Sequence, residues 1–188
     1  MKIIAIGAVT AGGKTTVIKS LINRMPNATS LHFDDYSFEG EVDDFHQWVI
    51  DGADYNVWNL EPFKNDIDKI IESNQYDYLF LDYPFAYKNE MIKDYIDCAI
   101  FIDTPLDIAM ARRVLRDMSK VSAEEIRSEM EIYLKYARIA YIQMLKDIKP
   151  ISDYVVDGNK DLESIVEEIM KKCRDKWIRN TDDNDNRR

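Results

Sequence analysis

The sequence contains little of what secreted, membrane-spanning or disulfide-stabilised proteins require. Only two of its 188 residues are cysteine, Cys98 and Cys173, which is too few for a disulfide framework and indicates reduced structural thiols. No apolar run reaches the roughly 18 residues that a membrane span needs. The apolar run at residues 3–6 is also too short for a signal peptide. We therefore expect a cytoplasmic protein with no membrane partner.

Positive charge and histidine are scarce as well. Lysine and arginine number 25 against 35 acidic residues, which gives a formal net charge of -10. Such a surface repels nucleic acid and anionic lipid, so nucleic-acid binding is disfavoured and a polyanion must bind through a local cluster of donors. The two histidines, His32 and His46, show no metal-ligand spacing. Core or surface roles are expected for both.

Apolar residues make up 46% of the chain and charged residues 32%, as in a globular protein with one full core. Short apolar runs without polar alternation are separated by helical patterns. This arrangement predicts an α/β fold of three layers, with a parallel sheet of five strands covered by helices on both faces. The strands are expected at residues 3–6, 29–33, 76–83, 97–103 and 153–158, and the helices at about 15–25, 41–50, 61–73, 106–117, 122–148 and 161–177.

We expect one domain over residues 1–178. The remaining residues, 179–188, carry no apolar side chain, which predicts a disordered tail. The sequence Ser122-Ala-Glu-Glu125 is a capping box, in which serine and glutamate satisfy each other's backbone donors at the start of a helix.

The stretch "IAIGAVTAGGKTTVIKSL", residues 4–21, resembles a phosphate-binding loop between the first strand and the first helix. Backbone N–H groups of such a loop point at a bound anion. Lys14 can reach the β- and γ-phosphates of a nucleotide, and the Thr15 hydroxyl can bind Mg²⁺. The signature G-x-x-x-x-G-K-[ST] has glycine where this chain has Ala8, so an alanine must keep a negative φ there.

Two carboxylates follow the second strand in "LHFDDY", residues 31–36. A carboxylate at that edge can accept the proton of an attacking hydroxyl while the neighbouring chain holds the rest of the acceptor. Asp34 and Asp35 are therefore candidate acceptor-site residues, together with Tyr36. The alternative is a helix cap or solvated turn, because paired aspartates are common in turns.

Asp82 ends the third strand in "FLDYP", residues 80–84, where phosphate-loop enzymes place an acidic partner of Mg²⁺. A turn aspartate before Pro84 is the alternative. Further along, the stretch "DTPLDIAMARRVLRDM", residues 103–118, carries Arg112, Arg113 and Arg116 on a helix. This local reversal of charge can present guanidinium groups to phosphate. A plain solvated helix is the alternative there.

The segment "YNVWNLEPF", residues 55–63, is rich in aromatic side chains. Tyr55 and Trp58 could line an acceptor pocket, because planar bases stack on such rings. A hydrophobic cover for the sheet is an equally good interpretation.

Taken in order, these motifs resemble the uridine kinase-like group of phosphate-loop kinases, which includes nicotinamide riboside kinases. The resemblance spans about residues 2–170. It rests on "GAVTAGGKTT", "HFDDY", "FIDTPLDIAMARRVLRDM" and "YLKYARIAYIQMLKDIKPISDYVVDG".

The resemblance implies ATP as the phosphate donor, with GTP as the alternative, and Mg²⁺ as the cofactor. By position, Asp34 matches the aspartate that activates the acceptor hydroxyl, and Thr15 with Asp82 forms the metal site. A short lid is implied around residues 112–122. The residues implied for nucleotide binding are Ala11, Gly12, Gly13, Lys14, Thr15, Thr16, Arg112 and Arg113, and Arg112 and Arg116 would act in catalysis with Lys14 and Asp34.

We therefore predict transfer of a phosphoryl group from ATP to a hydroxyl of a small molecule, most favourably a nucleoside or related riboside, by a monomer or homodimer. Two rivals remain. One is a kinase for another alcohol, such as a sugar, a shikimate-like acid or pantothenate. The other is a nucleotide-binding regulator or weak ATPase whose acceptor site is degenerate.

Overall fold

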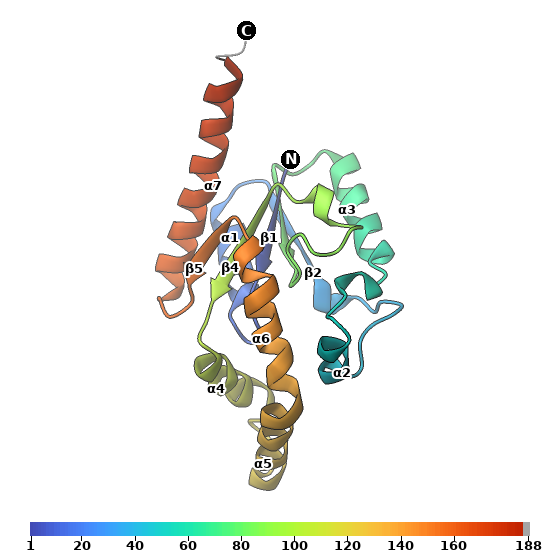
Figure 1. Ribbon diagram of the computed structural model, residues 1–188. Helices are drawn as coiled ribbons and strands as arrows, with labels where there is room; N and C mark the ends of the chain where they lie inside the picture. The colour runs from blue at the N-terminus through green and yellow to red at the C-terminus, as the bar shows by residue number, and fades with distance from the viewer. Residues whose placement is uncertain (186–188) are drawn as a thin grey trace.

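The five predicted strands form one sheet in which every neighbouring pair is parallel (Figure 1). The computed structural model describes the backbone of residues 1–185 and the side chains of residues 1–177. The strand order is β2-β3-β1-β4-β5. The predicted fold class is confirmed, with strands β1 (Lys2–Gly7), β2 (Ala28–His32), β3 (Tyr78–Asp82), β4 (Cys98–Asp103) and β5 (Tyr154–Asp157).

Helices cover the sheet, and each begins within a few residues of the expected position. Four short 3₁₀ turns lie in the connections, at Phe33–Asp35, Tyr55–Val57, Lys93–Tyr95 and Lys149–Ile151. The helices are α1 (Lys14–Arg24), α2 (Phe45–Ile50), α3 (Glu61–Ser73), α4 (Leu106–Asp117), α5 (Ala123–Ile132), α6 (Arg138–Asp147) and α7 (Leu162–Asp185), with a π-helical segment at Tyr133–Ala137 between α5 and α6.

Successive residues of β1 face two different cores, as the pleat of a strand requires. Ile4 and Ile6 pack with buried side chains of α1 and α7 on one face. Ile3 and Ala5 pack on the other face with Phe63 of α3 and with the aromatic segment before it. The strands therefore read as unbroken apolar runs because both of their faces are buried.

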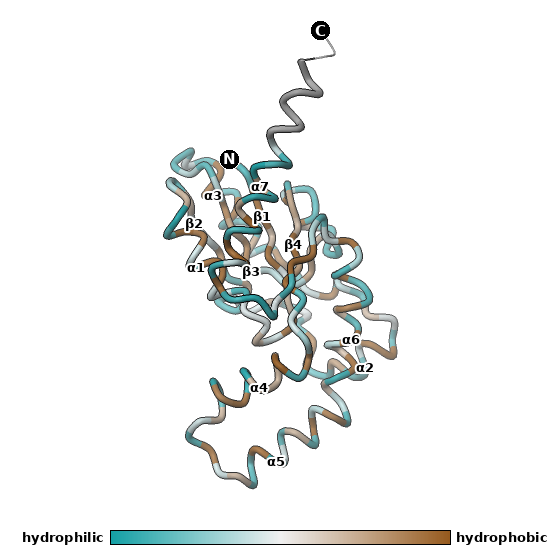
Figure 2. Tube along the Cα trace, turned by 90° about the vertical axis from the view of Figure 1, so that its left-hand side faces the viewer, coloured by the Kyte–Doolittle hydropathy of each residue, from teal (hydrophilic) through white to brown (hydrophobic). Residues whose placement is uncertain are grey.

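The carboxyl ends of the strands meet at one edge because all the strands run the same way. At that edge Asp82 lies level with Ile6 on one side and with His32 on the other, and Asp103 lies level with Asp157. Ligands of open parallel sheets bind outside this edge. Helices α4 and α5 project beyond it (Figure 2). The lid that the resemblance implies, around residues 112–122, corresponds to the end of α4 and the turn before α5.

The helix expected over residues 122–148 is present, with a π-helical segment in its middle. Its start is the predicted capping box, in which the Glu125 N–H donates to the Ser122 hydroxyl and the Glu125 carboxylate accepts from the Ser122 N–H. At the other end of the chain, α7 continues to Asp185, past the predicted domain end at residue 178. The rest of the predicted tail, residues 186–188, lies outside the described residues. None of the described helices is both long and apolar enough to cross a membrane.

One buried amide ties the aromatic segment to the connection between β3 and β4. The Asn89 side chain is fully buried and donates to the Tyr55 carbonyl at 2.9 Å and to the Trp58 carbonyl at 3.1 Å. Its carbonyl oxygen accepts from the Met91 N–H at 3.0 Å. Because each of these backbone groups would otherwise lose its partner, the amide holds the segment's path.

We expect Asn89→Leu to lower the free energy of unfolding by about 2 kcal/mol or more, because it leaves buried carbonyl groups without donors. Urea unfolding followed by circular dichroism measures the change. Asn65→Leu, on the exposed side of α3, is the matched control and should change stability by less than about 0.5 kcal/mol. Equal effects of the two substitutions would contradict the structural role of Asn89.

Candidate functional site

The loop between β1 and α1 has the backbone shape of an anion cradle. Gly13 caps α1 with φ 100°, a left-handed conformation that favours glycine. The Gly13 carbonyl accepts from the Val17 N–H at 3.0 Å, so the first N–H groups of the helix remain free to face a ligand. Ala11, two residues earlier, also has a positive φ, of 58°. A helix N-terminus built in this way favours phosphate.

Ala8 fits this loop without strain. It is 1% exposed and packs in the core formed by α1, α7 and the sheet. It is not among the described residues with positive φ, so its methyl group is compatible with the backbone. The departure from the glycine signature therefore leaves the loop intact.

The carboxylate of Asp82, 4% exposed, is the centre of a polar network at the end of β3. The Thr15 hydroxyl donates to Asp82 Oδ2 at 2.6 Å, and Lys14 Nζ lies 3.9 Å from Asp82 Oδ1. His32 Nδ1 lies 3.2 Å from Asp82 Oδ2, and its Nε2 lies 3.1 Å from the Ser30 hydroxyl. The loop, β2 and β3 thus meet at one buried charge.

This network suits Mg²⁺. Among the described residues no group of three or more His, Cys, Asp and Glu side chains is arranged to hold a metal. Mg²⁺ at phosphate sites needs few protein ligands, because it keeps several waters and takes further oxygens from the substrate phosphates. The Thr15 hydroxyl and the Asp82 carboxylate supply the hard oxygen donors that it prefers.

A cavity of about 590 Å³ lies over this network. Asp34, on the 3₁₀ turn after β2, lines it opposite the arginine helix α4. Hydrogen bonds to Asp117 raise the pKa of Arg116 despite partial burial, and the charges of Asp117 and Asp34 add to the effect. The lining includes the predicted residues Ala11, Gly12, Gly13, Lys14, Thr15, Thr16, Asp34, Trp58, Asp82, Arg112 and Arg116, with Glu41, Phe45 and Lys160 in addition.

Arg113 lines a different space from the other two arginines. A second cavity, of about 430 Å³, opens beside the first and shares Phe45, Phe85 and other residues with it. Arg113 lines this aromatic pocket from α4, and its Nη2 lies 3.7 Å from the Glu129 carboxylate. Its neighbours Arg112 and Arg116 line the first cavity, so the arginines of α4 line two different cavities. We define the aromatic pocket by its lining, Thr10, Phe45, Trp48, Tyr55, Phe85, Arg113, Asp117, Ala137, Ala140, Tyr141 and Met144.

The predicted acceptor residues are not all brought together. Asp35 lines neither cavity, and Tyr36 is directed toward α3, where its hydroxyl donates to Asp66 at 2.9 Å. Trp58 is 2% exposed and Tyr55 is 3% exposed, so both belong mainly to the hydrophobic cover of the sheet, the alternative interpretation of this segment. Trp58 also lines the first cavity, and Tyr55 lines the aromatic pocket. Burial, followed by the charge and hydrogen bond of Asp147, raises the pKa of Tyr55, which stays neutral.

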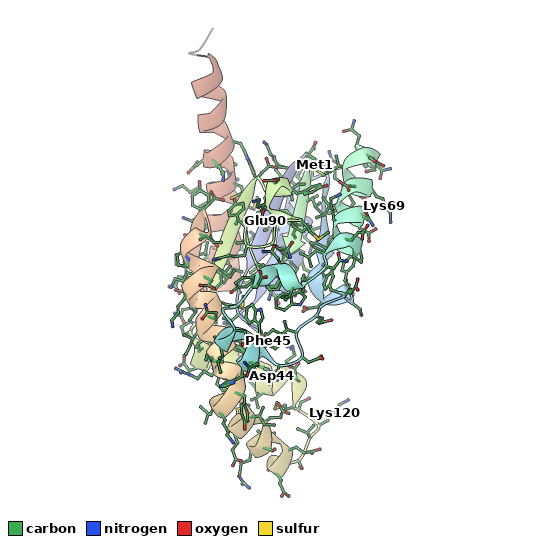
Figure 3. The ribbon with its side chains drawn as sticks, turned by 45° about the vertical axis from the view of Figure 1, so that its right-hand side comes forward. Met1, Asp44, Phe45, Lys69, Glu90 and Lys120 are labelled. Atoms are coloured by element: carbon green, nitrogen blue, oxygen red, sulfur yellow. The ribbon has the colours of Figure 1, made fainter. Side chains whose placement is uncertain are left out.

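Phe45 at the start of α2 lies between the sheet and the turn that carries Lys120 (Figure 3). The sequence pattern places a helix there but does not indicate that its aromatic side chains face the cavities. Met144 of α6, about 100 residues later in the chain, lines the same cavity. Only the packing of α2 against α6 brings these two together.

Known proteins show which family this chain belongs to. A family model described as the phosphoribulokinase / uridine kinase family matches residues 54–157, more than half of the chain. The chain belongs to this family. The expected resemblance is confirmed, and the protein is a small-molecule kinase of the P-loop type.

Two uridine kinases align with this chain over most of its length. It is 26% identical over 178 residues to a uridine kinase from Borrelia hermsii, covering 83% of this chain and 86% of the relative. It is 25% identical over 182 residues to a uridine kinase from Staphylococcus aureus, covering 82% of this chain and 86% of the relative.

Solved structures share the fold. A deoxyadenosine kinase from M. mycoides, 16% identical, superposes with a TM-score of 0.50 over 92% of this chain and 98% of that chain. A protein from Eubacterium ventriosum, 14% identical, superposes with a TM-score of 0.53 over 91% and 97% of the two chains.

A hydrogen bond between residues far apart in the sequence holds the phosphate loop of the kinase in place. The buried hydroxyl of Thr104, after β4, donates to the Gly12 carbonyl at 2.9 Å. Gly158, after β5, lies so close that a Cβ there would come within 2.0 Å of the Thr104 hydroxyl. A glycine that ends the fifth strand is the only sequence signal of this contact.

Replacing Thr104 with valine keeps its shape but leaves the buried Gly12 carbonyl without its donor, at a cost of about 1–3 kcal/mol. We expect nucleotide affinity, measured by calorimetry, to fall about fivefold or more as the loop loosens. Thr29→Val, on β2 away from the loop, is the control. An unchanged affinity in Thr104→Val would show that the loop holds its shape without this bond.

Proposed function

We propose that this kinase transfers the γ-phosphoryl group of ATP to a hydroxyl group of a nucleoside or related riboside. One observation carries the proposal. A single cavity is lined by the phosphate loop, the Thr15–Asp82 pair, Asp34 and two arginines, and it shares part of its lining with the aromatic pocket. The uridine kinase relatives support a nucleoside as the acceptor.

On the donor side, the loop residues Ala11 to Thr16 would surround the phosphates with backbone N–H groups. Lys14 Nζ, now 3.4 Å from the Ala8 carbonyl, has room to reach the β- and γ-phosphates. When bound, Mg²⁺ would neutralise charge on the transferring group, and Thr15 and Asp82 would hold it. These contacts act mainly by positioning and by electrostatic stabilisation.

On the acceptor side, Asp34 would accept a hydrogen bond from the attacking hydroxyl and take its proton. Asp34 is exposed and lines the cavity, so its carboxylate is available to a substrate. Arg116 is held by Asp117 through two hydrogen bonds of 2.6 Å and 2.9 Å. It would exchange this partner for phosphate when the lid closes, because phosphate carries the larger charge.

We extend the proposal to the donor, the location and the oligomeric state of the kinase. ATP is the proposed donor and GTP the alternative, in a cytoplasmic monomer or homodimer. A rigid aromatic pocket favours a ring-bearing acceptor over a sugar or a carboxylic acid, because an acid would need additional cations among its lining residues, where Arg113 alone is basic.

Lys14→Ala should lower kcat for nucleoside phosphorylation by about 10³-fold or more, because a preorganised charge on the transferring group is lost. A coupled ADP-release assay with uridine measures the loss. Lys19→Ala, exposed on the same helix, should retain full activity. Comparable activity in the two variants would rule out Lys14 as the phosphate ligand.

Asp34→Asn should lower kcat by about 10²–10⁴-fold, the range expected for loss of a general base, while ATP affinity stays within about threefold. The neighbouring Asp35, which lines neither cavity, provides a matched control, and Asp35→Asn should retain activity. If Asp34→Asn turns over normally, or if the wild-type protein binds ATP but phosphorylates no acceptor in a panel of nucleosides, ribosides and alcohols, the proposed function is wrong.

A further inference from the structure

Strand β2 brings a histidine to the end of β3 where the Mg²⁺ site is proposed. In the parallel register of the two strands, His32 is paired with Asp82 and Ser30 with Phe80. Side chains two residues apart on a strand share a face of the sheet, so Ser30 and His32 lie on the same face of β2. Paired positions of neighbouring strands are close enough for side-chain contact. The sheet therefore places the imidazole beside the carboxylate.

The imidazole of His32 connects two oxygen atoms. Its Nδ1 lies 3.2 Å from Asp82 Oδ2, and its Nε2 lies 3.1 Å from the Ser30 hydroxyl. A neutral imidazole carries one N–H, and an ionised carboxylate can only accept a hydrogen bond. We therefore assign the proton to Nδ1, which donates to Asp82, while Nε2 accepts from Ser30. The serine thus fixes the tautomer that directs the proton at the carboxylate.

The other two partners of Asp82 belong to the phosphate loop, and a nucleotide would change the role of both. Lys14 Nζ, 3.9 Å from Oδ1, would leave for the phosphates. The Thr15 hydroxyl gives its one proton to Oδ2 and keeps its lone pairs for a cation. His32 comes from a strand and lines neither cavity. Of these three contacts, its hydrogen bond is the one that a bound nucleotide would leave unchanged.

The contacts divide the two oxygens of the carboxylate between different tasks. Oδ2 accepts from both Thr15 and His32, whereas Oδ1 faces the loop and becomes free once Lys14 moves away. Rotation about the Cβ–Cγ bond of an aspartate is soft, and a partial turn would carry both oxygens away from these partners. The hydrogen bond from His32 opposes this turn. Since the Asp82 side chain is only 6% exposed, little water is available to replace it.

We propose that His32 is a positioning residue of this kinase, whose Nδ1–H holds the Asp82 carboxylate in the orientation that binds Mg²⁺ together with the nucleotide. The inference rests on the proposed function, which supplies the Mg²⁺–nucleotide complex. It adds a residue of β2 that acts through Asp82 and is not itself a ligand. Hydrogen-bond partners behind a metal ligand contribute about 10–100-fold to metal affinity or activity.

Titration of the protein with ADP, once with saturating Mg²⁺ and once with EDTA, isolates the contribution of the metal. The ratio of the two dissociation constants, measured by calorimetry, reports the coupling between metal and nucleotide on the protein. His32→Leu, which has no donor, should lower this ratio about tenfold or more, while the ADP affinity in EDTA stays within about threefold. A merely structural role would weaken binding equally under both conditions.

Two amide substitutions separate the two ring nitrogens. The amide nitrogen of asparagine lies as many bonds from the backbone as Nδ1 does, and that of glutamine as many as Nε2. His32→Asn should keep the donor to Asp82 and a ratio within about threefold of the wild type, whereas His32→Gln should resemble His32→Leu. Both amides are polar, so the pair guards against misfolding of the leucine variant.

The second histidine of the chain provides a matched control. His46 lies on α2, where its ring packs against Tyr136 with centroids 5.8 Å apart, and it lines neither cavity. His46→Leu should leave both dissociation constants of ADP unchanged. A loss equal to that of His32→Leu would show that the effect is not specific to the partner of Asp82, and the inference would be wrong.

The outcomes are distinct from those that test the proposed function. If His32→Leu keeps the wild-type ratio, or if His32→Asn and His32→Gln have the same ratio, the inference is wrong although the kinase still transfers phosphate. If His32→Leu weakens ADP equally with Mg²⁺ and with EDTA, His32 is only structural and the inference is again wrong. Failure of the proposed function appears in the wild-type protein itself, as the absence of any phosphorylated acceptor.

Discussion

The carboxylate of Asp82 is buried at the end of β3, and a charge in that position is costly unless donors surround it. Thr15 supplies a hydrogen bond at 2.6 Å, His32 lies 3.2 Å away and Lys14 contributes a positive charge at 3.9 Å. These groups come from the phosphate loop and β2, so satisfying one charge aligns both elements with β3. A Mg²⁺–nucleotide complex would meet donors that are already oriented.

Around this centre the fold places buried hydrogen bonds on one side and exposed arginines on the other. The bond from Thr104 to the Gly12 carbonyl fixes the loop from the β4 side, and Asn89 fixes the aromatic segment. Arg112 and Arg116, in contrast, are exposed on α4 and project over the cavity. This division suits phosphoryl transfer, in which the reacting groups must be held in a fixed geometry while positively charged side chains surround the phosphate.

Much of the fold could be predicted because apolar runs and helix signals are local. The five strands, the capping box at Ser122 and the phosphate loop all lie within a few residues of their expected positions. The directions of individual side chains were harder to predict from the sequence. Tyr36 follows the predicted acceptor aspartate by two residues yet turns to Asp66, and Arg113 lies beside Arg112 yet lines another cavity. A helix turns about 100° per residue, so adjacent side chains need not share a site.

The sequence by itself located the polar residues of the sheet edge, since parallel strands deliver their carboxyl ends to one place. Lys14 follows β1 after the loop, Asp34 follows β2 directly and Asp82 ends β3. The sequence also determined that Ala8 could be tolerated, provided that its φ stayed negative. Only the tertiary structure decided the shape of the aromatic pocket. Phe45, Phe85 and Met144 come from separate parts of the chain, and no local pattern specifies which faces of α2 and α6 meet, because helix packing depends on the whole core.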